Sequence, residues 1–134
     1  MIITGTIEYN NNGSLSEKKV NIDTAKKNSN VSRDVYDAVA FALYGKTVFQ
    51  EIVRPEKGVP MIALQITRNG KSVRIVRQPQ YIRETALGST YLTKGLFSLA
   101  TEEMQYDSLS AEKYYEMIKD YIDMSYEDFS KYCK

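Results

Sequence analysis

Histidine and tryptophan are absent from this chain, and its single cysteine is Cys133. Without histidine the sequence lacks the commonest acid–base catalyst and the commonest metal ligand in proteins. One cysteine excludes an intramolecular disulfide and a cysteine metal cluster. We therefore expect no cofactor and no metal, and the composition argues against an enzyme without excluding one.

An excess of charge of one sign is also lacking. The chain has 18 basic and 17 acidic residues, a formal net charge of +1, so its overall charge does not favour nucleic acid or an acidic partner. No apolar run reaches the roughly 18 residues of a transmembrane helix, and the first residues do not resemble a signal peptide. We expect a cytoplasmic protein without a membrane partner. The 134 residues suffice for a single domain, 1–134.

The strongest helical pattern runs from Ser32 to Tyr44. Its apolar residues follow the i, i+3, i+4, i+7, i+8 spacing of one helix face: Val35, Ala38, Val39, Ala42 and Leu43. Ser32 can cap the start, and Asp34 suits the positive first turn. Gly45 is placed for a left-handed stop. Because apolar residues cover most of its sides, we expect this helix to be central and buried.

A β-hairpin is predicted after two prolines and a glycine in the loop Arg54–Pro60. Ile62, Leu64 and Ile66 alternate with other residues, and Asn69-Gly70 is typical of a type I′ turn. If Arg68 pairs with Lys71, the apolar faces of both strands coincide. That register sets Ile66 opposite Val73, Leu64 opposite Ile75 and Ile62 opposite Arg77.

Weaker patterns predict the remaining elements. The predicted strands are Ile2–Tyr9 and Lys18–Ile22, joined by a long turn, with a third short hairpin over Tyr91–Leu99 that turns at Lys94-Gly95. Thr101–Ser108 is predicted to be an acidic loop. The predicted helices are Ala111–Ile122, capped by Ser110, and Tyr126–Tyr132, capped by Ser125, with Phe129 buried.

Three segments carry a family resemblance. The central helix reads Val-Tyr-Asp-Ala-Val-Ala-Phe-Ala-Leu-Tyr-Gly from Val35 to Gly45, the hairpin continues through Arg-Gln-Pro-Gln-Tyr-Ile-Arg to Arg83, and Asp-Met-Ser-Tyr-Glu-Asp-Phe ends at Phe129. In this order they resemble the SbcC family, SMC-like ATPases that partner a nuclease in DNA double-strand-break repair. The resemblance implies an α/β fold of the P-loop, ABC-type ATPase head. We expect part of one lobe, with a mainly antiparallel sheet packed on a central helix and with C-terminal helices.

The phosphate loop of that family is missing. A phosphate loop needs glycines, a lysine and a Ser or Thr hydroxyl directly before the helix. Here the chain reads Asn28-Ser29-Asn30-Val31-Ser32-Arg33-Asp34, without glycine or a Lys-Ser or Lys-Thr pair. Asp34 would point a carboxylate at the phosphates. The segment resembles an N-terminal half-head whose nucleotide site is degenerate, and ATPase activity is not carried over to it.

Three functional hypotheses follow. The first is a non-catalytic SbcC-like interaction module that binds an ATPase or nuclease subunit, DNA, or a second copy of itself, and so acts in break processing or its inhibition. Its plain alternative is a fragment of a repair ATPase without independent function. The second is a nucleic-acid-binding module. Its candidate phosphate-binding residues are Arg68, Lys71, Arg74, Arg77 and Arg83.

An ordinary solvated strand face is the simpler explanation of these basic residues. Arg77 is the weakest candidate, because the predicted register sets it opposite Ile62, where it would be half-buried and paired. The third hypothesis is an enzyme that uses carboxylates. The candidates are Glu102, Glu103, Glu127, Asp128 and, within the apolar helix, Asp37. Adjacent surface acids more often serve solvation or helix dipoles, and a buried aspartate more often has a structural role.

Overall fold

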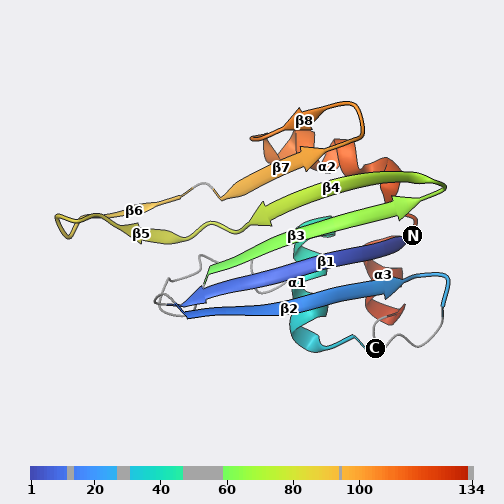
Figure 1. The fold of residues 1–134 in the computed structure, drawn as a ribbon, viewed down its shortest axis with the longest axis horizontal. Coiled ribbons are helices and arrows are strands. Elements are labelled where there is room, and N and C mark those ends of the chain that lie inside the picture. Colours follow the sequence, from blue (N-terminus) through green and yellow to red (C-terminus); the bar gives the residue numbers. More distant parts are fainter. Residues whose placement is uncertain (12–13, 27–30, 47–58, 94, 133–134) are drawn as a thin grey trace.

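One antiparallel sheet with all of the described helices on one side forms the body of the protein (Figure 1). The computed structural model describes residues 1–11, 14–26, 31–46, 59–93 and 95–132. The six strands of the main sheet lie in the order β2-β1-β3-β4-β7-β8, and β5 and β6 form a separate two-stranded ribbon. The predicted α/β class, with a mainly antiparallel sheet packed on a helix, is confirmed at this level.

Strands and helices follow one another along the chain in a β-rich first part and a helical C-terminal part. In chain order they are β1 Ile2–Asn11, β2 Ser14–Asp23, α1 Arg33–Tyr44, β3 Val59–Arg68, β4 Lys71–Gln78, β5 Ile82–Glu84, β6 Thr90–Leu92, β7 Leu96–Ala100, β8 Gln105–Tyr106, α2 Ala111–Ile118, the 3₁₀ helix η3 Lys119–Tyr121 and α3 Tyr126–Tyr132.

The central helix α1 forms as its sequence predicts. The Ser32 side chain accepts a hydrogen bond from the Val35 amide at 3.4 Å. At the other end Gly45 has φ 68°, the left-handed conformation that glycine adopts without steric cost, and its N–H donates to the carbonyl of Phe41 at 2.9 Å. Eight of the helix residues are buried, from Val35 to Leu43 with the exception of Asp37.

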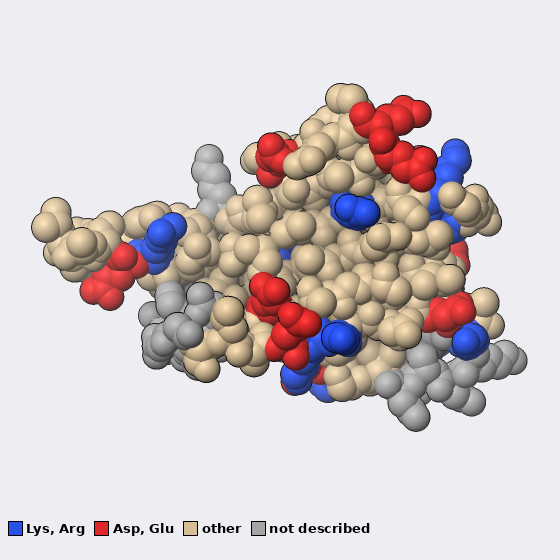
Figure 2. Space-filling model, viewed as in Figure 1, with Lys and Arg blue, Asp and Glu red and all other residues tan. Residues whose placement is uncertain are grey.

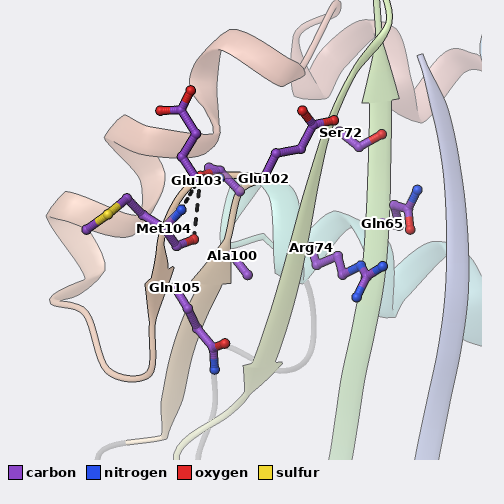
Figure 3. A pocket seen from close by; sticks show the side chains of 9 residues that line it. Gln65, Ser72, Arg74, Ala100, Glu102, Glu103, Met104 and Gln105 are labelled. Carbon is purple, nitrogen blue, oxygen red and sulfur yellow. Dashed lines mark hydrogen bonds between the residues drawn. The ribbon is translucent and has the colours of Figure 1, made fainter.

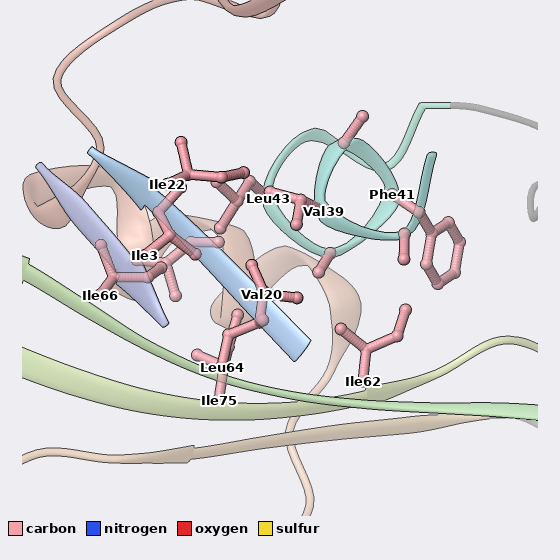
Figure 4. Packing of buried hydrophobic residues seen from close by; sticks show 14 of the residues in the cluster. Ile3, Val20, Ile22, Val39, Phe41, Leu43, Ile62, Leu64, Ile66 and Ile75 are labelled. Carbon is pink, nitrogen blue, oxygen red and sulfur yellow. The ribbon is translucent and has the colours of Figure 1, made fainter. Parts of the chain in front are cut away.

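The core lies between α1 and the inner face of the sheet. Figure 4 shows Val39 and Leu43 of α1 beside the aliphatic side chains of the first two strands. Val20 and Leu64 of this layer are 3% exposed. The other aliphatic strand residues at its centre are at most 1% exposed: Ile3, Ile7, Ile22, Ile62, Ile66, Val73, Ile75 and Leu99. Burying each such side chain stabilises the fold by about 1.5–3 kcal/mol.

The β3–β4 hairpin has the predicted register. Leu64 pairs with Ile75, Ile62 pairs with Arg77, and Arg68 pairs with Lys71. Asn69 and Gly70 have φ values of 52° and 76°, as a type I′ turn requires. Local turn chemistry and apolar alternation agree here, so the pattern fixes the pairing.

The predicted third hairpin is wrong. Leu96–Ala100 does not pair with the residues before Lys94. It pairs with β4, which sets Leu99 opposite Ile75 and Phe97 opposite Arg77. Leu99 is thereby buried, a gain that a local turn does not offer. The residues of β6 pair instead with β5, and this ribbon projects from one end of the sheet.

Several bounds differ from the predictions. Strand β2 begins at Ser14, ahead of Lys18, because its pairing with β1 continues to the end of that strand. Strand β3 already includes Val59 and Pro60, which were predicted as loop. Helix α2 ends at Ile118 and continues as the 3₁₀ helix η3. A short strand, β8, lies within the predicted acidic loop.

The C-terminal helices form the second layer together with α1. The Tyr114 hydroxyl donates to the carbonyl of Ala42 at 2.8 Å, and the Tyr44 hydroxyl donates to the carbonyl of Met124 at 2.9 Å. Phe129, fully buried as predicted, stacks on Tyr36 with ring centroids 5.7 Å apart. These contacts hold α2 and α3 against α1 and away from the opposite face of the sheet.

Gly5 is a position where the sheet has no room for a side chain. Its φ is 148°, and a Cβ there would lie 2.0 Å from the carbonyl oxygen of Ala63 on β3. We predict that Gly5→Ala lowers the free energy of unfolding by about 2–4 kcal/mol, measured by urea denaturation. Thr4→Ala on the same strand is the control, with an expected loss below about 1 kcal/mol. Equal losses in the two variants would contradict this packing.

Candidate binding surfaces

The five predicted nucleic-acid-binding residues do not form one patch. Arg68 and Arg77 lie on the helix side of the sheet, because they share the strand face of Ile66 and Ile75. Arg74 lies on the opposite face, Lys71 lies in the β3–β4 turn region, and Arg83 lies on the projecting ribbon. A groove that follows a nucleic-acid backbone needs such cations along one path. Only Arg68 and Lys71 are neighbours, and the other three lie on different faces or elements.

Arg77 is a structural residue. Only 7% of it is exposed, and its guanidinium carbon lies 3.6 Å from the ring centroid of Phe97 and 4.3 Å from that of Phe41. Its Nη1 donates to the carbonyl oxygen of Gln78 at 2.7 Å and to that of Leu96 at 3.3 Å. A cation enclosed in this way cannot reach a phosphate. These contacts argue against the predicted nucleic-acid contact of Arg77, and the side chain is buried, more deeply than the register predicts.

Arg68 is also engaged within the fold. Its Nη1 donates to the carbonyl oxygens of Asp120 and Ile122, each at 3.2 Å. These carbonyls belong to η3 and the residue after it, where a cation stabilises the end of a helical segment. Arg68 thus ties the end of β3 to the helical layer, and binding a phosphate would compete with those bonds.

Arg74 stands in a shallow hollow on the open face of the sheet. The hollow has a volume of about 550 Å³ and lies between β3, β4 and the turn from β7 to β8. Figure 3 shows Gln65, Ser72 and Arg74 on one side of it, with Glu102 and Glu103 on the other. Two carboxylates at the rim oppose the binding of a polyanion, so the surroundings of Arg74 argue against nucleic acid there.

The face of the sheet that the helices leave open is poor in charge. Its central side chains are mostly small and uncharged: Thr4, Thr6, Met61, Ala63, Gln65, Thr67, Ser72, Val76, Gln78, Ser98 and Ala100. In Figure 2 this face is largely tan, with charged groups gathered in a few places. Glu8, Glu17 and Lys19 lie together on it at β1 and β2, and Arg74 lies on β4. Sequence reasoning missed this surface. The sequence feature that indicates it is the set of residues alternating with the buried ones on β3, namely Met61, Ala63 and Gln65.

The projecting ribbon adds exposed apolar residues. Leu87 at its turn is 95% exposed, and Tyr91 and Leu92 on β6 are 48% and 49% exposed. A two-stranded ribbon is marginally stable by itself. The ribbon itself projects beyond one end of the main sheet, away from the helices (Figure 1).

The N-terminus of α1 is the place where the resemblance to SbcC-type ATPases implies a phosphate site. Residues 27–30 of the segment before it lie outside the described part of the chain. In the described part, the Ser32 hydroxyl oxygen accepts a hydrogen bond from the Val35 amide. The carboxylate of Asp34 forms an ion pair with Lys18 of β2. Burial raises the pKa of the Tyr9 phenol, and the nearby Asp34 charge adds to that rise. An anion at this helix end would meet a carboxylate.

The first turn of α1 uses its other charges internally. Arg33 Nε lies 3.2 Å from Asp37 Oδ1, and its guanidinium lies 5.4 Å from the ring centroid of Tyr36. Asp37, predicted to have a structural role, is thus an ion-pair partner one turn along the helix. The arrangement holds the helix end with side chains of its own and presents no free cation to a phosphate among these residues.

The other candidate carboxylates lie apart. Glu102 and Glu103 are exposed at the hollow, Glu127 pairs with Lys131 at 3.7 Å, and the amide of Asp128 donates to Ser125. Among the described residues, no three acids or cysteines are grouped as a metal site would require. In the same part of the chain, no helix combines the length and the apolar character needed to cross a membrane.

We predict that Arg77→Ala lowers the free energy of unfolding by about 2–4 kcal/mol, because it removes two ring contacts and two hydrogen bonds to carbonyls. Chemical denaturation measures the loss. Arg74→Ala, on the same strand but the open face, is the matched control and should change stability by less than about 0.5 kcal/mol. A costly Arg74→Ala and a neutral Arg77→Ala would reverse these assignments.

Comparisons with protein families, curated proteins and solved structures found no match to this chain.

Proposed function

We propose that this chain is a non-catalytic binding module of SbcC-like, SMC-like design that associates with an ATPase or nuclease subunit of DNA double-strand-break processing. The open face of the sheet is its docking surface. The observation that carries the proposal is the one-sided fold: every described helix packs on the inner face, and the outer face carries mostly small, uncharged side chains.

The composition of the open face favours a protein partner. Charged residues are depleted at the centre of protein interfaces, whereas nucleic-acid interfaces are strongly basic. Met61, Ala63 and Val76 lie at the centre of this face, on β3 and β4, and Arg74 is the cation nearest to them on the same face. A surface of small side chains allows close approach of a second backbone or of larger partner side chains.

The basic-hairpin alternative has less support. Arg77 is buried, and Arg68 is bonded to carbonyls of η3 and the residue after it. Lys71, Arg74 and Arg83 remain exposed but are distributed over the turn, the open face and the ribbon. Three separate cations give only weak, salt-sensitive attraction to a duplex.

The helix N-terminus supports a non-catalytic role. In the resembled family this helix end points at nucleotide phosphates. Here Asp34 and its partner Lys18 lie there, with Arg33 held by Asp37. The backbone dipole favours an anion at this end, and the chain supplies that anion itself.

A titration with Mg-ATP tests the non-catalytic part of the proposal. We predict no binding heat in isothermal titration calorimetry with nucleotide at millimolar concentration, because the Asp34 carboxylate lies at the helix end and no glycine loop precedes it. The control is an SbcC-type ATPase head titrated under the same conditions. Saturable ATP binding by this chain would overturn the view that the site is degenerate.

A second titration tests the docking surface. Purified SbcC-type ATPase head and its nuclease subunit are each passed over the immobilised chain, and the Kd is measured. We expect Ala63→Arg to weaken binding at least about tenfold, because it places a charge that must be desolvated at the centre of the interface. Glu116→Arg, exposed on α2, is the control and should leave the Kd unchanged.

Two outcomes would contradict the docking proposal. Neither subunit binds the unmodified chain, or Ala63→Arg binds as tightly as the unmodified chain while Glu116→Arg weakens binding. The second outcome would move the interface to the helical layer. Circular dichroism of each variant shows whether the fold is retained.

A further inference from the structure

Strand β2 is a long, regular edge of the sheet. All ten of its residues pair with β1 in one continuous register, from Ser14 opposite Asn11 to Asp23 opposite Ile2, without a bulge. Within the part of the chain that the structure describes, β2 has no strand on its other side. Such an edge is a template for pairing unless proline, a bulge, short length or charged side chains block it. Strand β2 has no proline and no bulge and is not short, so its charged residues Glu17, Lys18 and Lys19 decide whether and in which register it pairs.

The charges on the outer side of β2 have no ion-pair partner in the part of the chain that the structure describes. Glu17 lies directly opposite Glu8 of β1, a like-charge pair that disfavours the sheet. Lys19, two residues along on the same face, lies opposite Thr6. Both Glu17 and Lys19 are exposed, and neither has an ion-pair partner among the described residues.

This charge pattern is self-complementary. A twofold axis perpendicular to the sheet can pair β2 antiparallel with β2 of a second copy while both helical layers stay on the same side. If the axis passes beside Lys18, Glu17 lies opposite the second copy's Lys19, and Lys19 lies opposite its Glu17. Leu15 then faces Asn21, and Ser16 faces Val20. The two cross-strand ion pairs also offset the repulsion between Glu8 and Glu17.

Neighbouring registers are disfavoured by the same charges. Pairing that keeps the faces aligned moves the axis by whole residues along β2. An axis beside Glu17 sets two glutamates opposite each other, and an axis beside Lys19 sets two lysines opposite each other. Like charges directly opposite are destabilising. The register centred on Lys18 is the one that converts both outer charges into pairs.

Lys18 itself lies on the inner side, where the two copies of this residue would meet. Each Lys18 already forms an ion pair with Asp34 of its own α1. The axis therefore brings together two neutral pairs, four alternating charges in all, and no uncompensated lysines. Asp34 in the first turn of α1 neutralises the Lys18 charge, so the charge at the helix N-terminus affects pairing at the strand edge.

We propose that two copies of this chain associate through β2, antiparallel and centred on Lys18, to form one continuous sheet. The two open faces then lie on the same side of the dimer. A partner with two equivalent sites would be bound by both faces at once. The interface lies along the β2 edge, at the margin of the open face, whereas the docking proposal rests on the centre of that face around Ala63, so the two proposals are tested independently.

Analytical ultracentrifugation over a wide concentration range tests the pairing through a charge exchange. Lys19→Glu sets glutamate opposite glutamate twice across the axis, and Glu17→Lys sets lysine opposite lysine twice. Each single variant should raise the dimer Kd at least about tenfold. The double variant Glu17→Lys with Lys19→Glu exchanges the charges and should restore the Kd to within about threefold of the unmodified chain. Lys113→Glu on α2 is the charge-matched control and should have no effect.

Each other result overturns the proposal. A chain that stays monomeric up to about 1 mM does not pair usefully through β2. Dimerisation unaffected by both single variants places the contact elsewhere, on the open face or the ribbon. Loss of the dimer in the double variant as well as in the singles shows that the residues matter without facing each other. Thermal unfolding followed by circular dichroism confirms that each variant is folded.

Discussion

Packing of α1 against one face of the sheet is the constraint on which the rest of the structure depends. The helix is buried on almost every side, by the strands on one side and by α2 and α3 on the other. All of the large aliphatic residues in the buried layer of the strands turn towards it. The described helices all pack on this face, and nothing in the described part of the chain covers the opposite face of the sheet.

The same packing takes basic residues out of solution. Arg77 fills the space between Phe41 of α1 and Phe97 of β7, and Arg68 holds the end of β3 to η3. Two of the arginines that the sequence suggests as phosphate ligands thus stabilise the fold through internal contacts. The N-terminus of α1 likewise uses its own Asp34 and Lys18. The charged groups that would bind a nucleotide or a nucleic acid are engaged in contacts within the fold. For this reason we favour a protein partner.

Sequence reasoning succeeded where the determining interactions are local. The α1 caps depend on residues within one turn of the helix, and the β3–β4 register depends on Asn69-Gly70 and the alternation beside it. It failed where distant segments decide. Strand β7 pairs with β4 because Leu99 is buried opposite Ile75. The Arg77 side chain also donates a hydrogen bond to the carbonyl oxygen of Leu96 on β7. The open face was visible as alternate residues in β3, but no local pattern says which face helices will cover.

Oxidative footprinting of Met61 tests the central claim most directly. This side chain lies on the open face, on β3, and is partly exposed. In a complex with an SbcC-type ATPase head or its nuclease subunit, the account predicts that hydroxyl-radical oxidation of Met61 falls strongly. Labelling of Met117, which lies on α2 in the helical layer, should stay unchanged. Unchanged labelling of Met61 in a saturated complex, with protection confined to α2 and α3, would contradict it.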